Sequence, residues 1–130
     1  MTVSHAGRLI VISLAVCLMQ IDEPAGAESL FAVLNNCRRR ILIRLLNDTD
    51  SLCLREAAEI IAAKENTLDR SEVTTDQRNS VYVVLYQTHA PTMDAANVAT
   101  YDAQAKSLCP GEDWQLTYDI LYWTDYKLST

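Results

Sequence analysis

The sequence predicts a mainly α-helical domain with a small β-hairpin and a C-terminal helix. Apolar residues recur at helical spacing in several segments, and capping signals mark where the helices begin. Near the end of the chain, a strand–turn–strand pattern is closed by Pro110-Gly111. With 130 residues, 49% of them apolar, the chain has the size and composition of one folded domain.

Three regions are expected: an N-terminal extension over residues 1–28, the helical domain with its hairpin over 29–109, and an aromatic segment over 110–130. The extension contains an apolar run, Leu9–Met19, which is too short to span a bilayer. The run resembles a secretory signal because Arg8 precedes it and Ala25-Gly26-Ala27 follows. It also fits an extra helix, or a chain whose translation starts at Met19. Export is therefore the alternative to a cytoplasmic location.

An arginine-rich helix is expected from about Cys37 to Leu46, with Asn36 as its cap. Its basic residues are Arg38, Arg39, Arg40 and Arg44. They fit either a solvated basic face or a face that contacts DNA phosphates.

A short strand at Leu52–Leu54 and a second helix from Leu54 to about Lys64 are expected next. The sequence LREAAEIIAAK is rich in alanine and has high helix propensity. Cys53 stands where a serine or threonine cap would serve better. A polar link over 65–74 leads to the third helix.

The third helix begins with a capping box, Thr74-x-x-Gln77, and is expected to run from Thr75 to about Ala90. Pro91 should end or kink it there. Four side chains should face inward: Val81, Val84, Leu85 and Thr88. A neighbouring face should carry polar and aromatic side chains: Arg78, Asn79, Tyr82, Tyr86, Gln87 and His89.

The hairpin is expected to pair Val98–Asp102 with Lys106–Cys109, after Asn97 adopts a left-handed conformation. Residues 112–130 fit a strand or a helix, and their length without a partner strand favours a helix. Five aromatic residues lie in this tail: Trp114, Tyr118, Tyr122, Trp123 and Tyr126. They should cover the domain or form a homodimer contact.

The order helix, short strand, helix, helix, hairpin is the topology of a winged helix-turn-helix. The stretches SLFAVLNNCRRRILIRLL, LREAAEIIAAKEN and EVTTDQRNSVYVVLYQTHAPTMDAANVATYD also resemble a haloarchaeal winged-helix family of unknown specific function, related to arsenical-repressor-type winged helices. The run V-Y-x-x-L-Y-Q-T-H-x-P is the specific part. The chain departs from that pattern at Cys53, Ala90 and Asn97. The resemblance implies a DNA-binding transcription regulator of the archaeal cytoplasm, with double-stranded DNA as its partner.

DNA contacts are expected from two groups of residues. The third helix would place Gln77, Arg78, Asn79 and Tyr82 near base edges or phosphates, and Arg38, Arg39, Arg44 and Lys106 would contact phosphates. A formal charge of −6 opposes DNA binding. The acidic, lysine-poor composition resembles that of proteins from salt-loving archaea, where affinity relies less on counterion release, but it also fits an ordinary acidic protein.

The main alternative is a winged-helix module that binds another protein and not DNA. Neither an enzyme nor a metal or cofactor site is expected, because the sequence lacks the glycine-rich loops and metal-ligand spacings of such sites. His89 beside Pro91 is expected to be a structural residue rather than a catalyst. No membrane association is expected.

Overall fold

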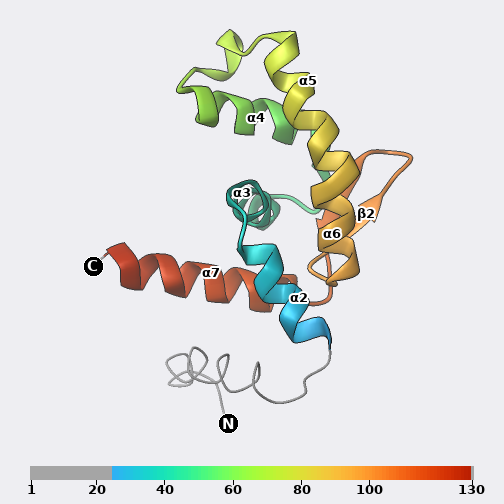
Figure 1. Cartoon of the computed structure of the whole chain (residues 1–130), viewed down its shortest axis with the longest axis vertical. Coiled ribbons are helices and arrows are strands. Elements are labelled where there is room, and N and C mark those ends of the chain that lie inside the picture. Colours follow the sequence, from blue (N-terminus) through green and yellow to red (C-terminus); the bar gives the residue numbers. More distant parts are fainter. Residues whose placement is uncertain (1–24, 130) are drawn as a thin grey trace.

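The chain folds into helices with a small β-sheet at one side of them (Figure 1). The structure is a computed structural model and describes residues 25–129. Its helices are α2 (Ala25–Leu34), α3 (Cys37–Leu45), α4 (Leu54–Asn66), α5 (Thr75–Val84), α6 (Ala90–Ala95) and α7 (Trp114–Ser129), with the short turns η1 (Leu46–Asp48), η2 (Arg70–Glu72) and η3 (Leu85–His89). The apolar run Leu9–Met19 lies outside the described residues. No helix in the described part of the chain has the length and apolar content needed to cross a bilayer.

The sheet has three short antiparallel strands: β1 (Leu52–Cys53), β2 (Ala99–Asp102) and β3 (Ser107–Pro110). Its order is β1-β3-β2, with Leu108 opposite both Leu52 and Tyr101. The predicted hairpin is thus confirmed, and the predicted lone strand is paired to it. Since β1 leads directly into α4, this pairing places the hairpin tip, residues 103–106, beside the start of α4. A mainly helical fold with this sheet is compatible with a winged-helix arrangement.

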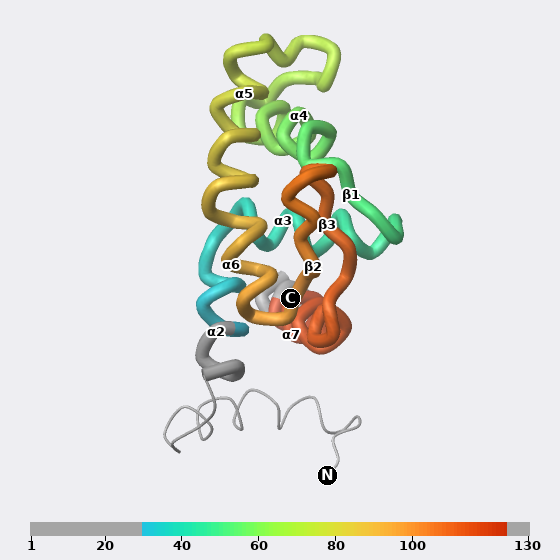
Figure 2. The backbone as a smooth tube through the Cα atoms, turned by 90° about the vertical axis from the view of Figure 1, so that its right-hand side faces the viewer, coloured from blue at the N-terminus to red at the C-terminus, as the bar shows by residue number. Residues whose placement is uncertain are grey.

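The core lies between α3, α4, the central helix and the sheet. Its largest fully buried side chains include Leu42, Leu54, Ile61, Leu85 and Leu108. Figure 2 shows the central helix, α5 to α6, running most of the height of the coloured trace, with α4 beside its upper part and α7 near its lower end. Burial of these apolar side chains is the main stabilising term.

The central helix is longer than the sequence predicts, and the expectation that Pro91 ends it near Ala90 is wrong, while the alternative, a kink there, stays a prediction. Helical structure continues from Thr75 to Ala95 through η3, a π-helical turn. In that turn the Ala90 amide donates to the Leu85 carbonyl, five residues back. A π turn widens the backbone locally, so the ring of Pro91 fits without the clash that it would cause in a regular helix.

The π turn also corrects which side chains face inward. It inserts one extra residue, so the inward positions after Leu85 shift by one along the chain. Thr88, expected inward, is exposed, whereas His89, expected on the polar face, is buried. Val81 and Leu85 lie before the shift and are buried as predicted.

The C-terminal segment is a helix, as predicted, and its first turns pack on the core. Trp114 is buried, and its indole Nε1 donates to the Ile43 carbonyl of α3 at 3.0 Å. Thr117 and Leu121 continue the buried face. The next residue, Tyr122, is 64% exposed. The start of the aromatic segment therefore covers the domain, while part of α7 faces solvent.

Candidate nucleic-acid interface

The start of α5 is fixed by the predicted capping box. Thr74 Oγ1 accepts from the Gln77 amide at 3.1 Å, and Gln77 Oε1 accepts from the Thr74 amide at 2.9 Å. These bonds satisfy two backbone donors that a helix start leaves open. The side-chain oxygen of Gln77 is thereby engaged in the cap. Its side-chain NH₂ group remains available to bind a ligand.

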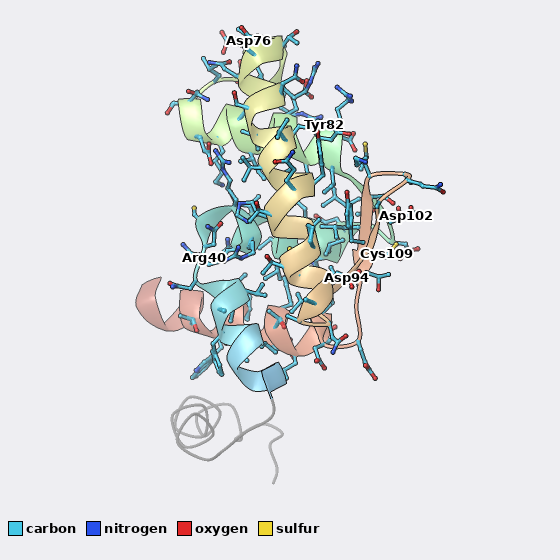
Figure 3. The ribbon with its side chains drawn as sticks, turned by 45° about the vertical axis from the view of Figure 1, so that its right-hand side comes forward. Arg40, Asp76, Tyr82, Asp94, Asp102 and Cys109 are labelled. Atoms are coloured by element: carbon cyan, nitrogen blue, oxygen red, sulfur yellow. The ribbon has the colours of Figure 1, made fainter. Side chains whose placement is uncertain are left out.

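The outward face of the central helix carries small and amide side chains. Three of its side chains are exposed: Asn79, Ser80 and Gln87. Asp76 lies in the first turn of α5, at the N-terminal end of the helix (Figure 3). An asparagine or glutamine amide offers one donor and one acceptor group side by side, the pair that matches the major-groove edge of adenine. Among the residues predicted to approach bases, Asn79 has the most open position.

A row of two tyrosines between two cations connects the start of α4 to the hairpin. The Arg55 guanidinium lies 4.8 Å from the Tyr82 ring centroid, and the Lys106 ammonium lies 5.0 Å from the Tyr86 ring centroid. The Tyr82 and Tyr86 rings pack edge to face, with their centroids 5.0 Å apart. We call Arg55, Tyr82, Tyr86 and Lys106 the cation–tyrosine row. Cation–π contacts hold two long charged side chains in place along one flank of the helix.

The hairpin fixes the end of this row that lies away from α4. Lys106 Nζ donates to the Ala103 carbonyl at 2.7 Å, which fixes the ammonium at the hairpin tip. Tyr101 of β2 is half-buried. Burial, followed by the nearby Tyr82 and Tyr86, raises the pKa of Tyr101. A tyrosine hydroxyl is already protonated at neutral pH, and this shift keeps it protonated, and so able to donate a hydrogen bond, to higher pH.

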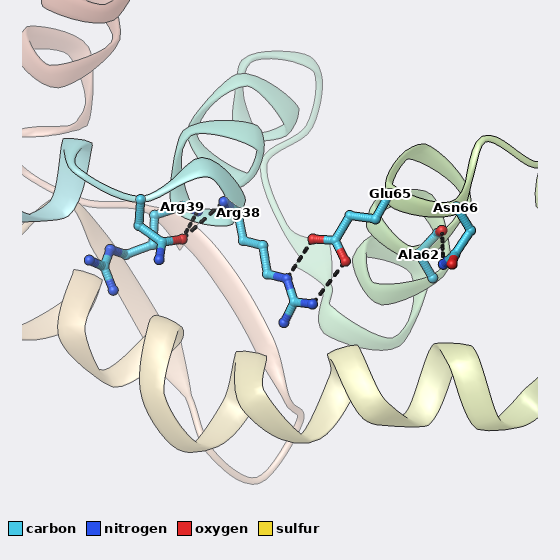
Figure 4. A network of polar contacts seen from close by, with 6 residues as sticks. Arg38, Arg39, Ala62, Glu65 and Asn66 are labelled. Carbon is cyan, nitrogen blue, oxygen red and sulfur yellow. Dashed lines mark hydrogen bonds and ion pairs between the residues drawn. The ribbon is translucent and has the colours of Figure 1, made fainter.

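In two of the predicted phosphate contacts, Arg38 and Arg39, the guanidinium group is bonded to other helices. Arg38 of α3 forms a two-pronged ion pair with Glu65 of α4, with N–O distances of 2.7 and 2.8 Å (Figure 4). This hydrogen bond raises the pKa of Arg38. Arg39 donates to the carbonyls of Ala32 and Val33 and to His89. Arg44 is exposed and has a contact of its own.

The Arg39–His89 contact joins α3 to the π turn. Arg39 Nη1 lies 3.1 Å from His89 Nδ1, and His89 is 5% exposed. Because arginine can only donate, Nδ1 accepts and the imidazole is neutral. Burial, followed by the charges of Arg39 and Arg38, lowers the pKa of His89 to about 4. His89 is thus buried, neutral and bonded to Arg39, which fits a structural role.

Of the predicted site, the structure connects Tyr82 to Lys106 through Tyr86 and places Arg78 near Arg55, while Asn79 is exposed and Gln77 is partly exposed on α5. Sequence reasoning missed Arg55 and the partnership of Tyr86 with Lys106. The spacing of Tyr82 and Tyr86, one helical turn apart, was a visible signal. Nothing local in the sequence indicates that Arg55 meets Tyr82, because that contact depends on how α4 packs against α5.

Comparison with known proteins shows that the chain belongs to a family described only as a domain of unknown function. A family model described as a domain of unknown function, DUF7344, matches residues 31–108, which is more than half of the chain. The matched stretch contains the cation–tyrosine row and ends before α7. No curated protein matches the chain, and no solved structure does.

Proposed function

We propose that this chain, which belongs to the DUF7344 family, is a winged helix-turn-helix protein that binds double-stranded DNA and regulates transcription. The order α3, β1, α4, α5, β2, β3 is that of a winged helix. In this proposal the central helix enters the major groove, and the hairpin tip reaches the phosphates beside it.

The cation–tyrosine row is the observation that carries the proposal. It places Arg55 and Lys106 on the flank of the central helix, where a groove-bound helix meets the DNA backbone. The net charge of −6 weakens long-range attraction. However, screening limits charge effects to about 10 Å at 0.1 M salt, so the charges nearest the phosphates matter most.

Sequence recognition is assigned to the outward face of the central helix. Asn79 is the main candidate for a base contact, and Gln77, through its amide NH₂, and Tyr82 flank it. Lys106 contacts a phosphate at the hairpin tip. Arg38 and Arg39 have no direct part in this proposal, because their guanidinium groups are bonded to other helices.

Binding of the full chain to the DNA upstream of its own gene, with random-sequence duplex as the comparison, tests the proposal. We expect specific binding in which Asn79→Ala lowers the preference for the upstream DNA by roughly 1–3 kcal/mol. Lys106→Ala should weaken binding to both duplexes. Lys64→Ala, at the exposed far end of α4, is the matched control and should bind like the unaltered chain.

Absence of binding to any duplex by the unaltered, folded chain would refute the proposal. The second candidate, a protein-interaction module, is favoured by Leu116 and Tyr122, which are 48% and 64% exposed on α7. Self-association that is lost in Tyr122→Ser, in a chain without DNA affinity, would support that second candidate.

A further inference from the structure

A pocket of about 400 Å³ opens between the start of α4 and the flank of α5. Five charged side chains and one cysteine line it: Arg55, Arg70, Arg78, Glu56, Glu59 and Cys53. It adjoins the cation–tyrosine row, because Arg55 belongs to both. Three arginines in so small a space suit an anion if their charges are not already neutralised by the two glutamates.

The two glutamates are engaged by one of the three arginines. Arg70 donates to Glu59 from both Nε and Nη2, at 3.0 and 2.7 Å, and its Nη2 lies 3.9 Å from Glu56. Within residues 25–129, neither Arg55 nor Arg78 forms an ion pair with a carboxylate. The three arginines and two glutamates of the pocket leave a net charge of +1, and Arg55 and Arg78 are the two cations that no close carboxylate of the described residues engages.

The two remaining guanidinium groups are held in place before any ligand arrives. The Arg55 guanidinium makes a cation–π contact with Tyr82, which restricts where this exposed side chain lies. Arg78 is half-buried one turn before Tyr82, on the side of α5 that faces α4. Its Nε is buried and donates to no acceptor in the described part of the chain. A guanidinium confined in this way gives up little side-chain entropy on binding.

We infer that Arg55 and Arg78 together bind one backbone phosphate of the DNA in this pocket. A phosphodiester carries one negative charge and two non-bridging oxygens, which match the N–H pairs of guanidinium groups. This inference rests on the proposed function. It changes the role of Arg78 from a candidate base contact to a phosphate contact, and leaves base recognition to Asn79.

The salt dependence of DNA affinity tests the inference, measured with the full chain on a random-sequence duplex. Loss of one phosphate contact should reduce the slope of log affinity against log salt by about 0.9. We expect Arg55→Ala and Arg78→Ala each to weaken binding about fivefold to tenfold, equally on random and upstream DNA. Because they share one phosphate, the double variant should lose less than the product of the two single losses.

Lys64→Ala, which removes a cation of α4 outside the pocket, is the control, and its affinity and salt slope should not change. Arg78→Lys keeps the charge without the two-pronged geometry and, if folded, should restore the salt slope but only part of the affinity. An unaltered chain that binds no DNA would overturn both this inference and the proposed function.

Two further results would overturn the phosphate contact alone. In the first, the chain binds DNA but Arg55→Ala and Arg78→Ala keep the full affinity and slope. In the second, Arg78→Ala changes the preferred base at one position, which would make Arg78 a base contact. Either result leaves DNA binding by the central helix intact.

Discussion

Gly111→Ala is expected to destabilise the protein by about 3 kcal/mol. A Cβ atom at this position would lie 2.6 Å from the Asn97 carbonyl oxygen, 2.8 Å from the Ala99 amide nitrogen and 2.9 Å from the Val98 carbonyl carbon. All three neighbours are backbone atoms, so no side-chain rotation can make room. Chemical denaturation of the variant and the unaltered chain measures the difference.

This close approach belongs to the turn that joins α6, the hairpin and α7. The Gly111 amide donates to the Val98 carbonyl at 2.9 Å, and the Asp113 amide donates to the Asn97 carbonyl at 2.8 Å. Asn97 adopts the predicted left-handed conformation, with φ of 64°. Glu112→Ala, at the exposed neighbouring position, should change stability by less than about 0.5 kcal/mol. A Gly111→Ala variant as stable as the Glu112→Ala control would contradict this packing.

Acidification from pH 7.5 to 5 is expected to lower the free energy of unfolding by about 2 kcal/mol through His89. The pKa of His89 is lowered from 6.5 to about 4 in the folded chain. In the unfolded chain the imidazole takes up its proton near pH 6.5. The contribution is therefore complete above pH 6.5 and is lost as the pH falls through this range towards 4.

His89→Asn isolates this effect, because an amide oxygen can accept from Arg39 and does not titrate. The absolute stability of the variant is not the readout; the difference between the two pH values is. We expect the variant to lose about 2 kcal/mol less than the unaltered chain over the same pH interval. Equal pH dependence in the two proteins would show that His89 is not the neutral, buried partner of Arg39.

Local signals in the sequence predicted the helix starts and the hairpin well. Asn36 caps α3 through hydrogen bonds to the amides of Arg38 and Arg39, and the Thr74 capping box is present in full. Cys53 makes no side-chain capping bond, as its chemistry suggests. Each of these features depends on residues within a few positions of one another, so the sequence alone contains the information.

Features that depend on packing could not be predicted from the sequence. The π turn accommodates Pro91 and reverses the exposure expected for Thr88 and His89. The arginines of α3 have similar sequence surroundings, yet Arg38 pairs with Glu65 and Arg39 binds the π turn. Likewise, the position of Arg55 over Tyr82 follows from the packing of α4 on α5. Such contacts join residues far apart in the chain.

Nuclear magnetic resonance of the isotope-labelled full chain, titrated with its upstream duplex, tests the central claim most directly. We predict that DNA changes the amide signals of α5, of the residues around Arg55 and of the hairpin tip, 103–106, and leaves those of α7 unchanged. Changes confined to α7, or an unaltered spectrum at saturating DNA, would contradict DNA binding through the central helix and the cation–tyrosine row.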